Sequence, residues 1–396
     1  MSAVWEVFAV FLRLGLTSFG GPVAHLGYFR TAFVARRGWL SEAAYADIVA
    51  LCQFLPGPAS SQVGMAVGLS RAGYAGALAA WIGFTLPSAV ALILFAYGLS
   101  HFGQAVPAGA LHGLKVAAVA VVAQAVWGMA RSLCPDAPRL TMMTLTAVVV
   151  AIAPSPAWQV GAMVVAGLVG ARLFRTAQAA PHEPLSVPVS HGFAVLCLAV
   201  FAVLLVGLPF AARESGSHAL ALVDAFYRAG ALVFGGGHVV LPLLQAAVVP
   251  PGWVDNDTFL AGYGAAQAVP GPLFTFAAFL GAANTLAPNG WAGGALCVLS
   301  IFAPSFLLVF GALPFWERLR RQPATRAALS GVNAAVVGLL LAALYQPVWT
   351  SAVQGPADFA LALLALTALT AWRVPPWAVV AGCALAGWGW QAAGFA

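Results

Sequence analysis

Residues 18–26 read SFGGPVAHL, and residues 233–241 read VFGGGHVVL. The two stretches share Phe-Gly-Gly, and an arginine, Arg13 or Arg228, lies six residues before each Phe-Gly-Gly. Paired glycines interrupt a helix because glycine has a low helix propensity and lets the backbone turn. The sequence therefore predicts a break in the chain at the same relative place in two similar halves.

The composition places these breaks inside a membrane protein. Hydrophobic residues make up 62% of the 396 residues and charged residues only 7%, which is too little charge to cover a soluble protein of this length. Apolar runs of about 20 residues, the length of a transmembrane helix, recur from end to end. No segment shows the alternation of a barrel strand. We therefore expect an all-α polytopic membrane protein.

The two halves match along their whole length. The matches keep their order while their spacing drifts only from 214 to 218 residues, which indicates an internal duplication. The matched pairs, first half before second, are Arg13 and Arg228, Gly15 and Gly230, FGG at 19–21 and 234–236, GW at 38–39 and 252–253, QFLPGP at 53–58 and QAVPGP at 267–272, TLPS at 85–88 and FAPS at 302–305, and LHGLKVAAVAVV at 111–122 and LSGVNAAVVGLL at 329–340.

Thirteen apolar segments define the organisation of the chain. They lie at 4–19, 43–70, 72–99, 109–131, 140–153, 157–173, 192–210, 219–245, 257–283, 290–315, 326–346, 357–371 and 375–392. The polar, proline-containing stretch 175–191 cannot span a membrane. We predict an N-terminal membrane domain at 1–174, a linker with a connecting transmembrane helix at 175–215, and a C-terminal membrane domain at 216–396. Because one segment separates two sets of six, the second half starts on the opposite side, which predicts an inverted-topology repeat.

Arginines in the loops favour a cytoplasmic N-terminus and an outside C-terminus in the cytoplasmic membrane. With every segment treated as one span, ten loop arginines lie inside, and Arg30, Arg36, Arg37 and Arg213 lie outside. If 4–36 and 43–70 are instead re-entrant hairpins that turn at FGG and PGP, the first three of these arginines move inside. We therefore expect broken or re-entrant helices at these motifs. Ordinary kinked spans are the alternative, since glycine and proline are common in membrane helices.

Charged residues at membrane depth are candidate substrate ligands because burying them there is costly. Arg13 has no acidic residue one turn away, so it suits an anionic substrate, whereas Asp224 lies one turn before Arg228 and can pair with it. Lys115 is the only lysine, it lies in an apolar run, and its repeat partner is Asn333. We predict that Arg13, Arg228, Lys115 and Asn333 bind substrate. A structural role beside a neutralising partner is the alternative for each.

The breaks offer a second kind of positive charge. A half-helix that starts inside the membrane exposes backbone N–H groups and the positive end of its dipole, and both attract anions. Proline is favoured where such a helix begins, and hydroxyl groups in its first turn can donate to an oxyanion. The breaks could also serve only to kink packed helices. The predicted substrate ligands at the breaks are Gly20, Gly21, Pro22, Gln53, Pro56, Gly57, Pro58, Ser60, Ser61, Gly235, Gly236, Gln267, Pro270, Gly271, Pro272 and Thr275.

Two histidines lie beside the two FGG motifs, although not at equivalent positions. His25 and His238 can titrate near neutral pH, so together with Asp224 they are candidates for proton coupling. A structural role is the alternative for each histidine.

Other function classes find little support. The chain has eleven acidic residues without a close intramembrane pair, and it has no HExxH, GxSxG or P-loop motif, so we expect no enzyme. Its five cysteines show no CxxC spacing, which predicts neither a metal site nor a cofactor. No soluble basic domain is present to bind nucleic acid. The residues alone therefore indicate a transporter of a small anion that is embedded in the lipid bilayer.

The paired FGG and PGP motifs resemble those of the chromate ion transporter (CHR) family. The resemblance covers about residues 5–390 and is to the long form, in which two homologous membrane domains are fused. It implies efflux of chromate driven by the proton gradient, and hence chromate resistance. The matching motif positions are Phe19, Gly20, Gly21, Pro22, Gln53, Pro56, Gly57, Pro58, Phe234, Gly235, Gly236, Gln267, Pro270, Gly271 and Pro272.

The halves have diverged, which bears on whether both contact substrate. Gly237 stands where the first half has Pro22, and Asn333 stands where it has Lys115, so we favour the first half as the substrate-binding one. Chromate and sulfate are both tetrahedral dianions, and the same donors would bind either. A transporter of sulfate or another small oxyanion, a membrane-embedded enzyme acting on anionic lipid, and a purely structural subunit remain the alternatives. A homodimer is compatible with each of these readings.

Overall fold

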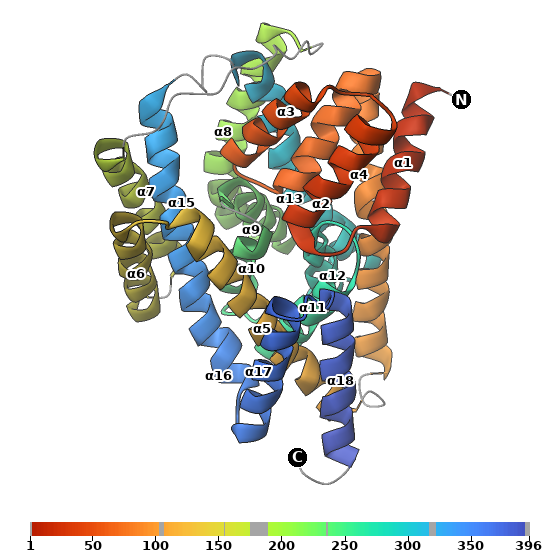
Figure 1. The fold of residues 1–396 in the computed structure, drawn as a ribbon, viewed down its shortest axis with the longest axis vertical. Coiled ribbons are helices and arrows are strands. Elements are labelled where there is room, and N and C mark those ends of the chain that lie inside the picture. The colour runs from red at the N-terminus through yellow and green to blue at the C-terminus, as the bar shows by residue number, and fades with distance from the viewer. Residues whose placement is uncertain are drawn as a thin grey trace.

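The computed structural model describes residues 2–102, 107–153, 155–174, 189–234, 237–316 and 322–392, and these residues form helices and loops without a β-strand (Figure 1). The first half contains α1 (Ala3–Thr17), α2 (Gly21–Phe29), η1 (Arg30–Arg36), α3 (Glu42–Phe54), α4 (Ala59–Phe102), α5 (Ala108–Leu133), α6 (Ala137–Ile152) and α7 (Pro156–Leu173), and α8 (His191–Ser215) follows. The second half contains α9 (His218–Leu232), η2 (Gly237–Val239), α10 (Val240–Val248), α11 (Asn256–Ala268), η3 (Leu273–Thr275), α12 (Phe276–Ala282), α13 (Gly290–Ala312), η4 (Leu313–Phe315), α15 (Pro323–Ala343), η5 (Leu344–Trp349), α16 (Thr350–Ala352), α17 (Pro356–Thr370) and α18 (Pro376–Ala392).

Helix starts are fixed by polar caps at matching positions in the two halves. The Ser41 side chain accepts a hydrogen bond from the backbone of α3, and Asp255 does the same for α11. Ser2 and Ser217 cap α1 and α9 in the same way. Such caps satisfy N–H groups that have no partner inside the helix. The duplicated amino-acid sequence therefore begins its helices at equivalent positions in both halves.

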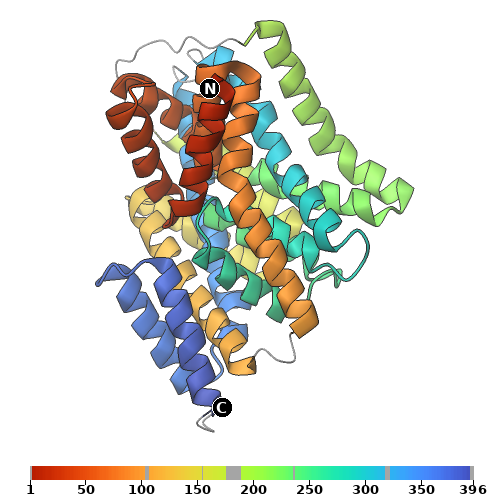
Figure 2. The same ribbon diagram turned by 90° about the vertical axis from the view of Figure 1, so that its right-hand side faces the viewer.

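The repeat has inverted topology, as predicted. The second part of α4, from residue 74, and its equivalent α13 run in opposite directions along the long axis of the molecule (Figure 2). The equivalent helices α5 and α15 also run in opposite directions (Figure 1). α8 is the odd connecting helix, and only 11% of its most apolar stretch is buried. An exposed apolar helix of 25 residues suits contact with lipid tails.

Five of the described helical segments are long and apolar enough to cross a membrane, and the other apolar helices are shorter. The long segments are Ala59–His101, Ala108–Leu133, His191–Ser215, Gly290–Phe315 and Pro323–Ala352. The shorter helices adjoin the FGG and PGP motifs or form the last pair of each half. A chain that alternates full spans with half-length helices is typical of transporters with inverted repeats.

The half-length helices form hairpins rather than kinked spans. α1 runs from the N-terminal end of the molecule to its middle, and α2 with η1 returns beside it (Figure 2). α3 and the first part of α4 form the next hairpin, which ends at a kink between Ala72 and Gly73 (Figure 1). The expected re-entrant helices are therefore confirmed. Pro22 is the second residue of α2, whereas Pro58 and Pro272 directly precede their helices, so the predicted first helical position is one residue off in each case.

The last two helices of each half pack against the opposite half. α6 and α7 pack on α15, while α17 and α18 pack on α5. Glycines allow these close approaches: a Cβ on Gly331 would lie 2.1 Å from the Ala166 carbonyl oxygen, and one on Gly113 would lie 2.1 Å from that of Cys383. The halves are thus interwoven around α5 and α15. The predicted domain boundaries describe the sequence repeat, while the packing crosses them.

Candidate functional site

The breaks of the two halves meet and cap each other. The Gly57 N–H donates to the Val233 carbonyl at 2.7 Å, and the Gly271 N–H donates to the Ser18 carbonyl at 3.0 Å. These two hydrogen bonds are equivalent under the repeat. Each PGP loop therefore binds the free C-terminal end of the first helix of the other half, where carbonyl groups lack helical partners.

Glycine is required at the two crossing points. Gly57 has a φ of +122° and Gly271 a φ of +104°, a region that side chains rarely adopt. A Cβ would lie 3.0 Å from the Ser305 Oγ at Gly57, and 2.9 Å from the Ser88 Oγ at Gly271. These serines end the matched FAPS and TLPS motifs. The motifs themselves were apparent in the sequence, but the contact of each serine with the opposite half was not.

A small central cavity of 60 Å³ lies where the first FGG meets the second PGP. Six predicted site residues line it together, namely Gly20, Gly21, Pro22, His238, Gln267 and Gly271. Gln124 of α5 also lines the cavity and was not among the predicted residues. An amide within an apolar helix, at a position where the other half has Ala342, was the signal that could have identified it.

The polar groups of this cavity are neutral dipoles. The Gln267 Nε2 atom is buried and has no hydrogen-bond partner in the described part of the chain. Gln124 donates to the Leu369 carbonyl at 3.3 Å, and His238 Nδ1 lies 3.0 Å from the Tyr263 hydroxyl oxygen. The N-terminal end of α2 begins at Gly21 and directs its dipole toward the same space. This arrangement can hold a small anion through N–H donors without a fixed charge.

The first PGP loop is packed more tightly and does not line this cavity. His25 is 1% exposed, and its ring nitrogens lie 3.2 Å from the Ser18 carbonyl oxygen and 3.3 Å from the Ser60 Oγ. The histidine thus joins the tips of the two hairpins of the first half. The Ser61 Oγ is buried without a partner in the described part of the chain, and Gln53 is exposed at the end of α3. Pro56 and Pro58 belong to the first PGP loop, and Pro270 belongs to the second.

In the second half, the Thr275 hydroxyl donates to the Pro272 carbonyl at 2.7 Å. It is therefore occupied within its own turn. Asn333 lies partly buried on α15 and is not among the residues that line the central cavity. Gly235 and Gly236, both predicted ligands, lie outside the described residues.

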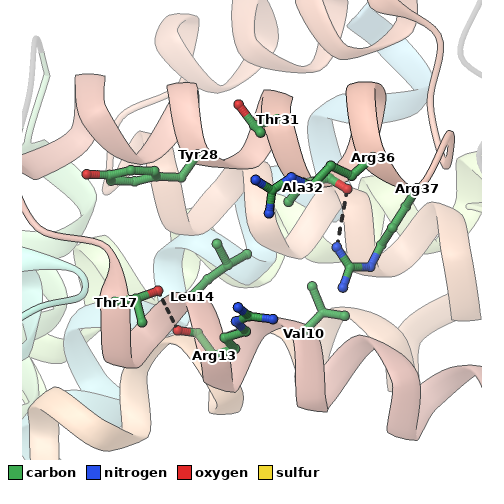
Figure 3. A pocket seen from close by; sticks show the side chains of 9 residues that line it. All are labelled: Val10, Arg13, Leu14, Thr17, Tyr28, Thr31, Ala32, Arg36 and Arg37. Atoms are coloured by element: carbon green, nitrogen blue, oxygen red, sulfur yellow. Dashed lines mark hydrogen bonds between the residues drawn. The ribbon is translucent and has the colours of Figure 1, made fainter.

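Arg13 lies in a separate groove between α1 and the α2–η1 segment (Figure 3). The groove has a volume of 640 Å³, and Arg36 and Arg37 also line it. Figure 3 shows the three side chains directed into the space between the two helices. The structure thus brings the predicted Arg13 together with two arginines that we had treated only as markers of topology.

The equivalent groove of the second half contains Arg228 and has a volume of 360 Å³. There the expected ion pair is present, with Arg228 Nη2 and Asp224 Oδ2 2.5 Å apart. The α8 helix and Gln159 of α7 also line this groove. The paired arginine of the second half therefore differs from Arg13, for which the described residues offer no ion-pair partner.

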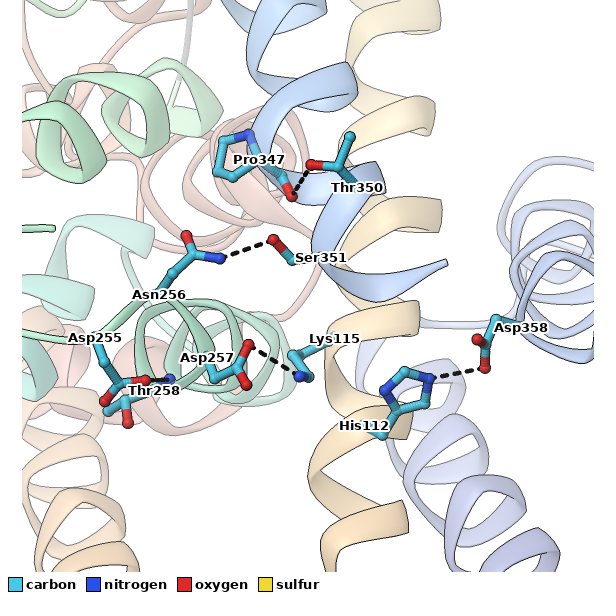
Figure 4. A network of polar contacts seen from close by, with 10 residues as sticks. All are labelled: His112, Lys115, Asp255, Asn256, Asp257, Thr258, Pro347, Thr350, Ser351 and Asp358. Carbon is cyan, nitrogen blue, oxygen red and sulfur yellow. Dashed lines mark hydrogen bonds and ion pairs between the residues drawn. The ribbon is translucent and has the colours of Figure 1, made fainter. Parts of the chain in front are cut away.

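Lys115 lies away from the central cavity, nearer to the N-terminal end of α5 than Gln124. Its Nζ atom is 3.0 Å from Asp257 Oδ1 at the start of α11 (Figure 4). One turn earlier on α5, His112 lies 2.8 Å from Asp358 of α17. These contacts join α5 to two neighbouring helices of the second half. Asp257 was not among the residues singled out in the sequence.

No group of three or more His, Cys, Asp and Glu side chains is arranged to hold a metal ion in the ranges that the structure describes. The five cysteines are all buried, reduced and separate. At the centre, the described residues gather neutral hydrogen-bonding groups around one small cavity.

Comparison with known proteins agrees with this chemistry. The family model described as chromate transporter matches residues 5–171 and again residues 220–388. The chain is 28% identical to the chromate transport protein of Pseudomonas aeruginosa, over 97% of this chain and 91% of that protein. It is 27% identical to the chromate transport protein of Cupriavidus metallidurans, over 95% and 90% of the two chains. It is 26% identical to the probable chromate transport protein of Synechococcus elongatus, over 84% and 81%.

No solved structure matches the chain. The two family matches confirm the duplication, because each covers one half. Together with the long apolar helices, they identify a multi-pass membrane transporter built from two homologous halves. The chain therefore belongs to the chromate transporter family.

Proposed function

We propose that the chain exports chromate from the cytoplasm, that the proton gradient drives the export, and that the anion binds in the central cavity between the first FGG and the second PGP. The crossing of the breaks is the observation that carries this proposal. Gly57 and Gly271 hold the ends of four half-length helices around one point, and Gln267 leaves an unused amide donor there. Broken helices that meet around a midplane site are typical of secondary transporters.

The size and the dipoles of the cavity suit a small dehydrated oxyanion. A volume of 60 Å³ admits a few water-sized groups and excludes a nucleotide or a lipid headgroup. A tetrahedral dianion accepts several hydrogen bonds at once, so Gln124, Gln267, His238 and the start of α2 can bind it together. The same donors also fit sulfate. Chromate is proposed because relatives over nearly the whole chain are named for it.

Alternating access follows from the inverted halves in this proposal. The central cavity opens first to one side and then to the other as the half-length hairpins move against the long helices. His238 is the proposed proton-coupling group because it lines the cavity, whereas both ring nitrogens of His25 have partners. Asp224 is engaged with Arg228. The N-terminus is placed in the cytoplasm and the C-terminus outside. All lining residues of the cavity come from one chain, so a homodimer would contain two such cavities.

The test is chromate uptake into inverted membrane vesicles, with and without a proton gradient and with excess sulfate. We expect gradient-dependent accumulation that Gln267→Leu abolishes. Gln53→Leu is the matched control because Gln53 is the repeat equivalent of Gln267 but is exposed at the end of α3. Accumulation that ignores the gradient would refute proton-driven export. Equal loss in both variants would refute the central site, and uptake of labelled sulfate in place of chromate would reassign the substrate.

A further inference from the structure

The groove of Arg13, Arg36 and Arg37 gathers positive charge without a counter-ion. Its lining contains no acidic residue. The nearby acids Glu6 and Glu42 at this end of the chain are already bound, to Arg71 at 3.1 Å and to Arg30 at 2.6 Å. Three guanidinium groups that face one space repel each other unless an anion lies between them. The described lining of the groove therefore carries a positive charge that no acidic side chain in it balances.

Hydroxyl groups complete the lining. Thr17 and Thr31 are among the residues that line the groove, and the lining residue Tyr28 is 43% exposed. The threonine hydroxyls donate to the Arg13 and Gly27 carbonyls, so of the three hydroxyl groups only the Tyr28 phenol has an O–H donor that these contacts leave available for an anion. Guanidinium forks with hydroxyl groups beside them are the usual partners of phosphate-like groups.

Comparison with the equivalent groove shows that this chemistry belongs to the first half. Going from the first half to the second, Thr17 is replaced by Leu232, Tyr28 by Leu243 and Thr31 by Ala246. The two further arginines, directly before the first Gly-Trp pair, are replaced by Pro250 and Pro251 before the second. The remaining Arg228 is neutralised by Asp224. Divergence from a common repeat has thus left one groove in which Arg228 is paired and Arg213 of α8 also belongs to the lining, and one groove that three arginines line without an acidic residue.

The depth of the groove in the membrane decides which anions can reach it. Arg13 lies four residues before the end of α1, or about 6 Å along the axis, and Arg36 ends η1, roughly 22 Å after the start of α2. With the breaks near the midplane of a hydrocarbon core of about 30 Å, the groove reaches from the inner core to the headgroup level. Leu16 on the neighbouring face of α1 is 56% exposed, as a lipid-facing side chain would be.

We propose that this groove is a second anion site, separate from the central cavity, that binds a tetrahedral oxyanion of the phosphate type. The ligand is either the headgroup phosphate of an anionic lipid or a free oxyanion from the aqueous side. In both cases Arg13 and Arg36 hold it between α1 and η1, and Arg37 adds charge at the rim. The inference does not depend on which anion the central cavity transports.

The test measures thermal unfolding of the purified full chain in lipid nanodiscs. We expect that phosphatidylglycerol in a phosphatidylcholine bilayer, or free inorganic phosphate added to pure phosphatidylcholine, raises the unfolding temperature. Protection by the lipid alone assigns the site to a headgroup, and protection by free phosphate assigns it to an aqueous oxyanion. The double variant Arg36→Gln with Arg37→Gln should weaken binding by roughly tenfold or more, since each charged hydrogen bond contributes that much.

Control variants show whether the loss of protection depends on the groove itself. Arg30→Gln and Arg71→Gln, made together with Glu42→Gln and Glu6→Gln, remove two guanidinium groups from the same end without freeing a carboxylate, so protection should equal that of the unaltered chain. Arg36→Lys with Arg37→Lys should show intermediate protection if folding tolerates it. Gln124→Leu should keep the free-phosphate effect because it alters only the central cavity. No protection by either ligand, or equal loss in the Arg30 and Arg71 control, would overturn the proposal.

Discussion

Replacing Gly57 with alanine tests whether the two halves are held by the crossing of their breaks. Gly57 donates its N–H to Val233 across the pseudo-symmetric centre. The added methyl group must fit at a φ of +122° and 3.0 Å from the Ser305 Oγ. It also lies 2.6 Å from the Gln62 Nε2, which donates to the Pro56 carbonyl.

The expected cost has three parts. The backbone conformation costs a non-glycine residue about 1–3 kcal/mol. Overpacking against Ser305 adds about 1–3 kcal/mol, because the serine lies on a long packed helix and cannot move freely. Displacing Gln62 loses one hydrogen bond, or about 0.5–1.5 kcal/mol. The sum, about 2.5–7.5 kcal/mol, is a large part of the 5–15 kcal/mol that typically stabilises a folded domain.

The buried cysteines provide the assay. All five are buried, so a fluorogenic maleimide reacts with them only as the protein unfolds. Gly38→Ala is the control because its φ of +59° is also positive, yet nothing lies within 4 Å of the added Cβ. Alanine there should cost only about 1–2 kcal/mol. We expect Gly57→Ala to unfold at a distinctly lower temperature than Gly38→Ala.

A second substitution separates the steric part from the backbone part. Ser305→Gly in the Gly57→Ala background should recover the overpacking share, about 1–3 kcal/mol, because it removes the contacting hydroxymethyl group. Gly271→Ala should behave as Gly57→Ala does, since its Cβ would meet Ser88 at 2.9 Å. If Gly57→Ala unfolds at the temperature of Gly38→Ala, or if Ser305→Gly recovers nothing, the tight packing at the crossing does not stabilise the fold.

Three further predictions concern ion pairs and topology. Asp257→Asn should lower the unfolding temperature more than Lys115→Met does. The lysine side chain is 10% exposed and would be left buried and unpaired by the first change, whereas the carboxylate left by the second is 70% exposed. Equal effects of the two variants in the maleimide assay would contradict this prediction. By the same reasoning Arg228→Gln should destabilise the protein more than Asp224→Asn does, because it leaves the Asp224 carboxylate, which is 8% exposed, without its ion-pair partner. The reverse order of stabilities would show that the pair is not buried as described. A cysteine introduced as Arg36→Cys should react with a membrane-impermeant maleimide only from the side that holds the N-terminus; reaction from the opposite side would disprove the hairpin formed by α1 and α2–η1.

Much of the architecture was readable in the sequence because it rests on local rules. The charge content and the apolar runs predicted a polytopic helical membrane protein, and the motif matches in conserved order predicted the duplication, which the two family matches confirm. Glycine and proline marked the breaks, since these residues act on the backbone of their own segment. The odd connecting helix, now α8, was enough to predict the inversion.

Other features depend on which distant segments meet, and only the tertiary structure decided them. Gln124 lies at the centre while its near neighbour Lys115 pairs with Asp257 elsewhere, although both are polar residues of one apolar helix. Gln53 and Gln267 are equivalent in sequence, yet only Gln267 lines the cavity. The sequence by itself determined the helices, their breaks and their inverted repetition. The structure decided which breaks cap each other, which acid pairs with Lys115 and which motif residues share a cavity, because those outcomes depend on packing between halves that have diverged at single positions.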